Sequence, residues 1–434
     1  MIGRARTPVD TAEAASASAT VGQRPPDPIS VTLALGSDPY QQRLPTALLR
    51  EGMLRRLLSF RPEPEVADPN PAGSMEVVKR FPGFKAANRI LWAGWKRLPG
   101  TAHSHVPKVA STWLADRLAS KYVPPSTVFH GLAGTCLACM QAAKRLGAAT
   151  VLESPTLHLR QWQDEVMAEC AHFGVDPRDC DSILPESLIR RVQGEYDLCD
   201  WIIVLSSATR QSFAQFGFAE KTILVWPGVD HLLFTPPREI KPAPLFRVSY
   251  VGRVEIAKGV GYLLEAWNRL GLPGAELVLV GMVRPEVETL LRRYGDTSVR
   301  LPGSLPPAQV ANCYRDSSVF AFPSVNEGLG MVLLEAMSSG LPVIATDRTG
   351  APDLVTDGKE GFVVPARNVD ALAERILWCY QHRDQARAMG WAARIKVEEQ
   401  FTLEHYEQRQ INVCRQLNGS SQAAAPDIKA PLSA

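Results

Sequence analysis

The sequence lacks features that would assign it at once to several broad classes of protein. None of its apolar runs reaches the roughly 18 residues that a membrane-spanning helix needs. Neither sign of charge dominates, because 47 Lys and Arg residues face 45 Asp and Glu residues and the formal net charge is +2. A dedicated nucleic-acid-binding protein is normally far more basic. We therefore expect neither a membrane span nor a nucleic-acid partner.

Cysteines are few and almost all are isolated in the sequence. Of the eight, only Cys136 and Cys139 are close together, and no second close pair completes a zinc site. They lie in "TCLACMQAAKRLG", whose small apolar residues predict a helix, so we expect core thiols rather than a metal or redox site. Scattered free cysteines are typical of the reducing cytoplasm, and we expect a cytoplasmic protein.

The two ends of the chain lack apolar patterning. Residues 1–28 are rich in Ala, Ser, Thr and Pro, contain Asp10 and Glu13, and have no apolar segment of the kind that a signal peptide needs. Residues 419–434 have a similar composition. We expect a disordered leader and a disordered tail, neither of which carries chemistry.

What the chain does contain is a repeated alternation of strand and helix patterns, and it is too long for one ordinary core. We expect "SVTLALG" to be a strand and "TALLREGMLRRLLSF" a helix, opening an N-terminal domain over 29–235. A Pro-rich linker, 236–245, precedes a second series over 246–398 and a last helix at 399–418. Such alternation predicts the α/β class, with two Rossmann-like doubly wound domains facing across a cleft, where ligands bind at the strands' carboxyl ends.

An irregular insertion, 61–110, interrupts the first domain. It begins with a Pro-rich loop and continues with a segment at 79–97 in which basic residues alternate with Phe and Trp. Basic and aromatic residues interleaved in this way suit an anionic membrane surface, which makes peripheral contact with a membrane one interpretation. A solvated helix whose aromatic rings face the core is the other.

The usual glycine-rich phosphate signatures are missing, since no strand is followed by G-x-G-x-x-G and no Walker motif occurs. The segment "VGRVEIAKG" instead places Arg253 and Lys258 after a predicted strand. Two cations beside a glycine, at the carboxyl end of a strand and before a helix, can neutralise a diphosphate. Solvated surface residues are the alternative reading of this pair taken alone.

The stretch "NEGLGMVLLEAMSSG" supplies a second part of such a site. If a helix begins near Leu329, its free N–H groups favour a phosphate, and Gly328 and Gly330 allow the backbone to approach closely. Glu335 then lies about 9 Å further along the axis, at the reach of a ribose. Glu327, on the preceding loop, meets a group on the far side of the phosphates. This geometry describes a nucleoside diphosphate-sugar.

These segments, followed by "GLPVIA" and "DGKEGFVV" and preceded by "WPGVD", resemble the donor half of family 4 retaining glycosyltransferases with the GT-B fold. The resemblance covers most of residues 200 to 400. It implies that Arg253 and Lys258 hold the donor diphosphate and that Glu335 binds the ribose. It also implies that Glu327 reaches the hydroxyls of the donor sugar. Gly328, Leu329, Gly330 and Met331 would then present backbone to the phosphates.

The N-terminal half departs from the family. Its first loop reads "LGSDPYQQ" where two glycines are common, so Gly36 is a weak candidate for the acceptor side. In "VLESPTLHLRQW", His158 aligns with a histidine that borders the reaction centre in relatives, and His130 is its rival. A helix histidine satisfied by a neighbour is the other interpretation of His158. Asp353 also stands where the family usually has glutamate.

The resemblance implies a retaining glycosyltransferase in which the departing diphosphate accepts the proton of the acceptor. Catalytic roles then fall to Glu327, His158, Arg253 and Lys258, and we expect neither a metal nor another cofactor. The donor base, the sugar and the acceptor stay open. A non-hydrolysing nucleotide-sugar epimerase and a non-catalytic membrane-associated module that binds nucleotide-sugars are the alternatives.

Overall fold

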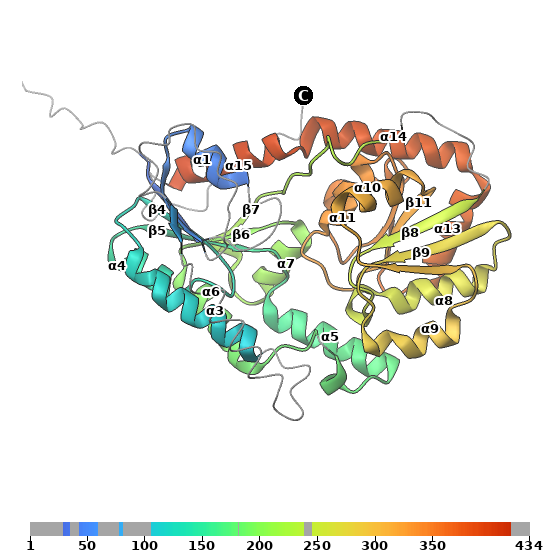
Figure 1. Ribbon diagram of the computed structural model, residues 1–434, viewed down its shortest axis with the longest axis horizontal. Coiled ribbons are helices and arrows are strands. Elements are labelled where there is room, and N and C mark those ends of the chain that lie inside the picture. Colours follow the sequence, from blue (N-terminus) through green and yellow to red (C-terminus); the bar gives the residue numbers. More distant parts are fainter. Residues whose placement is uncertain are drawn as a thin grey trace, which may run out of the picture.

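The computed structural model describes residues 29–34, 43–59, 78–80, 106–180, 182–237 and 245–417. The expected leader and tail, Gly36, most of the linker and most of the insertion lie outside these residues. The described chain forms two α/β units side by side, with the first at the left of Figure 1 and the second at the right.

Each unit is built on a parallel sheet. Within the described residues the first sheet has seven strands in the order β3-β2-β1-β4-β5-β6-β7, and the second has six in the order β10-β9-β8-β11-β12-β13. Both are the doubly wound order, in which the chain starts in the middle and reverses direction once. The two Rossmann-like domains expected from the sequence are therefore confirmed.

The strands and helices have the following bounds. The strands of the first sheet are β1 Val31–Ala34, β2 Leu54–Ser59, β3 Val78–Arg80, β4 Val128–Leu132, β5 Ala149–Ser154, β6 Trp201–Val204 and β7 Thr222–Leu224. Those of the second are β8 Phe246–Val251, β9 Ala275–Val280, β10 Val299–Gly303, β11 Val319–Phe322, β12 Val343–Thr346 and β13 Gly361–Val364. The helices that precede the second domain are α1 Leu44–Arg50, α3 Val106–Ala119, α4 Leu137–Arg145, α5 Leu159–Phe173, α6 Glu186–Leu198 and α7 Ser207–Gln215. Those that follow are α8 Val260–Leu270, α9 Glu288–Tyr294, α10 Pro307–Arg315, α11 Met331–Ser338, α12 Ala351–Leu354, α13 Val369–Gln381, α14 Arg383–Gln400 and α15 Leu403–Leu417.

The first sheet buries both of its faces. Along β5, Val151 belongs to the apolar cluster on one face and Leu152 to the cluster on the other, where α4 and α6 pack. Successive side chains of a strand point to opposite faces, so a strand covered on both sides is apolar throughout. Cys136 and Cys139 are buried in the second cluster, which confirms the expectation of core thiols.

One expected helix is wrong in its second half. The stretch "TALLREGMLRRLLSF" forms α1 only as far as Arg50 and then turns into β2, which pairs in parallel with β1. The cause is Gly52, whose φ of 66° is left-handed and ends the helical path. The helical spacing of its leucines did not reveal that they would fill both faces of a sheet.

The chain crosses between the domains twice, and the two crossings lie against each other. The segment after β7 bridges to the segment between α14 and α15 at Val229 and Thr402. At Gly228 an added Cβ would lie 2.2 Å from the Thr402 carbonyl oxygen, so only glycine fits. The two segments that connect the domains are thus packed against each other.

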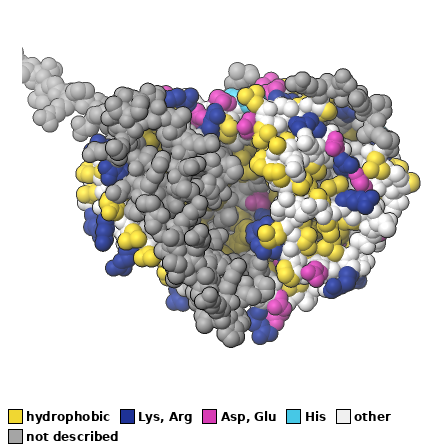
Figure 2. All heavy atoms as spheres, viewed as in Figure 1, with side chains coloured by type: hydrophobic (Ala, Val, Ile, Leu, Met, Phe, Trp, Pro, Cys, Tyr) yellow, Lys and Arg dark blue, Asp and Glu magenta, His cyan; other side chains and the backbone are white. Residues whose placement is uncertain are grey.

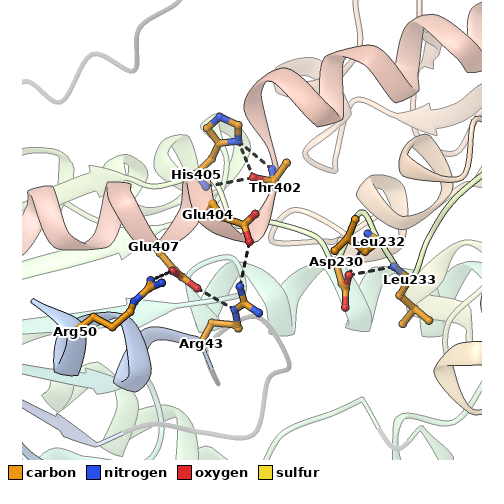
Figure 3. Close-up of polar contacts among 9 residues, drawn as sticks. All are labelled: Arg43, Arg50, Asp230, Leu232, Leu233, Thr402, Glu404, His405 and Glu407. Carbon is orange, nitrogen blue, oxygen red and sulfur yellow. Dashed lines mark hydrogen bonds and ion pairs between the residues drawn. The ribbon is translucent and has the colours of Figure 1, made fainter. Parts of the chain in front are cut away.

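After the second crossing, α15 packs on the first domain beside α1 (Figure 1). The close-up in Figure 3 shows Glu404 and Glu407 of α15 pairing with Arg43 and Arg50. The Arg43 Nε to Glu407 Oε1 distance is 2.9 Å. These ion pairs attach the C-terminal helix to the N-terminal domain.

Candidate active site

A cavity of about 350 Å³ lies where the second sheet changes winding direction, at the carboxyl ends of β8 and β11. This is the position at which doubly wound sheets bind ligands. The first domain closes the cavity with the loops that follow β5 and β6. The lining residues from the second domain are Val251, Gly252, Arg253, Lys258, Phe322, Glu327, Leu329, Gly330, Met331 and Val332, and those from the first are Pro155, Thr156, Trp162 and Leu205.

Lys258 and Glu327, 69 positions apart in the sequence, form an ion pair in this cavity. The Lys258 Nζ to Glu327 Oε2 distance is 2.5 Å, and both side chains are largely buried. Gly259 makes the approach feasible, because a Cβ there would lie 1.9 Å from the carbonyl oxygen of Pro323, just after β11. Gly259 is therefore needed for the turn that holds Lys258 to pack against the end of the neighbouring strand β11.

Arg253 is the more exposed of the two cations. Its guanidinium lies 3.0 Å from the buried Glu255 carboxylate, whose other oxygen accepts a hydrogen bond from Ser182 of the first domain. Because Arg253 lines the cavity and keeps 43% of its side-chain surface exposed, it can meet a ligand there. The structure thus brings both predicted cations to one cavity.

The glycine turn at 328–330 reaches the same cavity and leads directly into α11. Gly330 has a φ of 87° and precedes the helix, and a Cβ there would lie 2.6 Å from the Phe322 ring. Residues 329–332 line the cavity, Gly330 among them without a side chain, and the N–H groups of the first helical turn lie in this segment. The helix begins at Met331, two residues later than we expected.

Glu335 lies one turn into α11 and does not line the cavity itself. Its Oε2 accepts a hydrogen bond from the Tyr314 hydroxyl at 3.1 Å. Loss of hydration raises the pKa of Glu335 to about 7, although the tyrosine bond acts in the opposite direction. The pKa of this carboxyl group therefore lies near neutral pH. The group lies beside the cavity and does not line it.

The structure does not bring His158 into the cavity. The residue stands at the start of α5, and its ring is buried, stacked on Phe216 with centroids 3.8 Å apart and edge-on to Phe213. Burial lowers the pKa of His158 to about 4. The ring is packed by aromatic side chains, but neither of its nitrogens has a hydrogen-bond partner among the described residues, so the alternative of a histidine satisfied by a neighbour is not met either.

His130 is buried as well, in β4. Its Nε2 lies 3.2 Å from the Glu153 carboxylate of β5, which also accepts a hydrogen bond from Gln410 of α15 at 3.3 Å. This group joins the sheet to the returning helix and lies outside the cavity lining. Neither predicted histidine contacts the cavity, and Gly36 lies outside the described residues.

Trp162 is one of several cavity residues that sequence reasoning missed. It comes from α5 of the first domain, is almost fully buried, and holds its ring 5.4 Å from Lys258 Nζ, a cation–π distance. Its backbone carbonyl accepts a hydrogen bond from Asn326, next to Glu327. Nothing in the local pattern separates this tryptophan from an ordinary helix residue, although its place soon after a strand end is a weak signal.

Two further observations concern the described residues only. They contain no group of three or more His, Cys, Asp or Glu side chains placed to hold a metal ion. In the same residues, every helix is too short or too polar to cross a membrane. On the face of the second domain shown in Figure 2, basic and acidic side chains are interspersed.

Known proteins resemble this chain in sequence and in fold. Residues 246–382 match a family described as "Glycosyl transferases group 1". A GDP-mannose-dependent alpha-(1-6)-phosphatidylinositol monomannoside mannosyltransferase of Mycobacterium tuberculosis is 32% identical over 299 residues, which cover 63% of this chain and 72% of that protein. The putative colanic acid biosynthesis glycosyltransferase WcaL of Escherichia coli is 32% identical over 194 residues, 42% of this chain and 48% of WcaL.

Two solved structures support the fold. Sucrose-phosphate synthase from Thermosynechococcus elongatus superposes with a TM-score of 0.65 at 21% identity, over 90% of this chain and all of that one. Anabaena HepE in complex with UDP superposes with a TM-score of 0.59 at 17% identity, over 89% of this chain and all of HepE. At these identities the likeness concerns the fold alone.

Proposed function

Because the chain is a glycosyltransferase of the group 1 family with the GT-B fold, we propose that it transfers a sugar, with retention of configuration, from a nucleoside diphosphate-sugar. The donor occupies the cavity between the domains, and the acceptor comes from the side of the first domain. The relatives are named as transferases, which disfavours both the epimerase and the non-catalytic module.

The observation that carries this proposal is the arrangement of one cavity. Lys258, Glu327, Leu329 and Gly330 meet there, from two loops that are far apart in the sequence. A cation, the free N–H groups at a helix start, and glycines that allow the backbone close to a ligand are the groups that bind a diphosphate. A carboxylate beside them, Glu327, is an acceptor for sugar hydroxyl groups.

The chemistry follows from charge. As the bond between the anomeric carbon and the phosphate oxygen breaks, negative charge grows on the leaving diphosphate. Arg253, Lys258 and the N–H groups of the turn stabilise that charge because they are already oriented before the reaction. The leaving phosphate oxygen then takes the proton of the acceptor hydroxyl on the same face of the sugar, which gives retention. With this positive charge in place, we propose that transfer needs no metal or other cofactor.

Glu327 and Glu335 have different parts in the proposal. When a diphosphate engages Lys258, the Glu327 carboxylate loses its partner and becomes free to accept hydrogen bonds from the sugar. Glu335 lies one turn further along α11, in reach of the ribose, where its carboxylate would accept the two hydroxyls. His158 and His130 do not line the described cavity, so this proposal assigns them no role.

The experiment that tests the proposal is release of free diphosphate from a panel of nucleotide-sugars. GDP-mannose and UDP-glucose are the first two donors, because one relative is named GDP-mannose-dependent and HepE was solved with UDP-glucose. We expect one donor to give turnover. Its nucleoside diphosphate, at 100 times its dissociation constant, should add about 2.7 kcal/mol to the free energy of unfolding and so raise the unfolding temperature. Absence of both effects across the panel would refute the function.

We also propose peripheral contact with an anionic membrane through the first domain. The structure describes little of the 79–97 segment, but it describes α3 and the turn that follows. There Leu114, Leu118 and Tyr122, four positions apart, are each about 40% exposed, and Arg117 and Lys121 lie between them. Exposed apolar residues flanked by cations suit the headgroup region of such a membrane.

A further inference from the structure

A single carbonyl group of the second domain accepts hydrogen bonds from two hydroxyls of the first. The carbonyl oxygen of Gly328, within the glycine turn, accepts from Thr209 Oγ1 at 2.8 Å and from Ser206 Oγ. Ser206 and Thr209 are both fully buried at the start of α7. These are contacts between the domains that lie behind the cavity wall rather than in it.

Both hydroxyl groups lie within hydrogen-bond distance of this carbonyl, and they also lie 2.9 Å from each other, so one of them can donate to the other instead. Ser206 caps α7, so its oxygen accepts from the Thr209 N–H at 3.1 Å and its own proton is free to be donated. A hydroxyl has one proton, and a carbonyl oxygen has two lone pairs. The hydroxyl pair therefore hydrogen-bonds to the Gly328 carbonyl oxygen and holds it toward α7.

The orientation of this carbonyl sets the direction of the next N–H group. In a planar trans peptide the C=O of one residue and the N–H of the following residue point in opposite directions. With the Gly328 carbonyl held by α7, the Leu329 N–H points away from that helix, and Leu329 is part of the cavity wall. Among the described residues this N–H has no hydrogen-bond partner, whereas the Leu329 carbonyl is held by the Gly350 N–H at 2.8 Å.

The same turn is pressed against the first domain at a second point. An added Cβ at Gly328 would lie 1.8 Å from the carbonyl oxygen of Pro155, in the loop after β5. On the other side, Asp353 of the second domain accepts from the Ser207 N–H at 2.7 Å. These contacts exist only when the two domains are closed on each other, because each joins one domain to the other.

We propose that Ser206 and Thr209 are positioning residues that make the phosphate site complete only when the domains close. In the closed state their hydroxyls turn the peptide between Gly328 and Leu329 so that the Leu329 N–H faces the leaving phosphate. In an open state the peptide is free to rotate and this donor is lost. The inference rests on the proposed function, and it adds a coupling between closure and stabilisation of the leaving group.

The primary test variant is Thr209→Val, which removes the hydroxyl and keeps the shape. Thr222→Val is its matched control, because the Thr222 hydroxyl is also buried and donates to a carbonyl at 2.8 Å, that of Ala219 in its own domain. Thr209→Ser, which keeps the hydroxyl, is the rescue variant. All are assayed with the donor found in the nucleotide-sugar panel, for transfer and for the slow hydrolysis of that donor without acceptor.

We expect Thr209→Val to lower kcat about tenfold, less than the loss of a whole oxyanion donor, because the N–H is misdirected rather than deleted. Transfer and hydrolysis fall together, since both expel the same diphosphate. The affinity for the free nucleoside diphosphate changes by less than about threefold, because the second domain binds it without closure. Thr209→Ser and Thr222→Val stay within about twofold of the unaltered enzyme.

Two results would overturn the inference. One is a Thr209→Val enzyme that behaves like Thr222→Val. The other is a loss confined to transfer with hydrolysis unchanged, which would mean that only the acceptor side was disturbed. If the unaltered enzyme releases no diphosphate from any donor, the proposed function itself fails, and that outcome is distinct from both.

Discussion

Lys258 and Glu327 form an ion pair of 2.5 Å at the centre of the cavity, between the turn after β8 and the turn before α11. On the proposed function, a donor diphosphate would compete with Glu327 for the lysine. The two residues should therefore respond oppositely to substitution when nucleotide binding and turnover are measured separately.

The first prediction concerns this pair. Lys258→Met should weaken binding of the nucleoside diphosphate by about 1.5–3 kcal/mol, the range for a hydrogen bond to a charged group. Glu327→Gln should leave that binding unchanged or tighter, since the lysine loses its competitor, and should lower kcat. Calorimetric titration and steady-state kinetics measure the two effects. Lys359→Met, at an exposed lysine of the same domain, is the control and should change neither. Equal losses of affinity in Lys258→Met and Glu327→Gln would contradict the assignment.

The second prediction concerns the ribose. Glu335→Ala should reduce the affinity for the nucleoside diphosphate by about 1–3 kcal/mol, because two hydroxyls lose a buried acceptor. The affinity for inorganic diphosphate, which has no ribose, should stay the same. Glu398→Ala, at a glutamate that pairs with Arg394 far along α14, serves as the control. A matching loss for inorganic diphosphate would show that Glu335 acts on the fold of α11 instead.

The third prediction is a dependence of stability on pH. Burial raises the pKa of Glu335, and separately that of Glu195, to about 7, against a usual value of 4.5. Between these values the folded state binds more protons than the unfolded state, so the free energy of unfolding falls as pH rises through this window. Each carboxyl should contribute on the order of 1–3 kcal/mol to the fall.

The variants Glu335→Gln and Glu195→Gln test this dependence. Because His158, with its pKa lowered to about 4, acts with the opposite sign, each variant is compared with the unaltered protein at the same pH. Urea unfolding at about pH 5 and about pH 8 should show a smaller fall in each variant. Parallel curves for variant and unaltered protein would mean that the carboxyl is ionised throughout.

The fourth prediction tests closure. Gly328→Ala should hold the domains apart, because its Cβ would lie 1.8 Å from the Pro155 carbonyl oxygen. Small-angle X-ray scattering should give a larger radius of gyration, and kcat should fall by about 100-fold or more, as for loss of an oxyanion donor. Gly194→Ala is the control, since the nearest atom to its Cβ is 3.9 Å away on Leu137 and the helix tolerates alanine. An unchanged radius with full activity would show that the turn moves aside.

The fifth prediction concerns the membrane. The protein should float with phosphatidylserine vesicles at low salt and less at about 0.5 M salt, since surface charges are screened. Leu114→Ser combined with Leu118→Ser should reduce binding. Leu232→Ser, at a leucine that is 77% exposed near the crossing between domains, should not. Equal flotation with neutral phosphatidylcholine would exclude an electrostatic contact.

The meeting of the second-domain residues at one cavity was predictable because each lies in a local pattern. Arg253 and Lys258 follow one strand, and the turn at 327–330 opens one helix, so short segments place each group relative to a strand end or a helix start. The ends of neighbouring parallel strands meet at one edge of a sheet, which brings these groups together without further information. The same reasoning was wrong for β2. The helical spacing of its leucines predicted a helix, but these residues form a strand that is buried on both faces.

The contribution of the first domain was decided by tertiary structure. Trp162, Ser206 and Thr209 come from α5 and α7, and nothing in their own segments shows that they would face a turn more than a hundred residues away. His158 had the stronger local signal, yet its ring is enclosed by aromatic side chains. The sequence by itself determined two doubly wound domains and the placement of two cations and a glycine turn at the edge of the second sheet. How the domains close on that site depends on contacts between surfaces, which local periodicity does not encode.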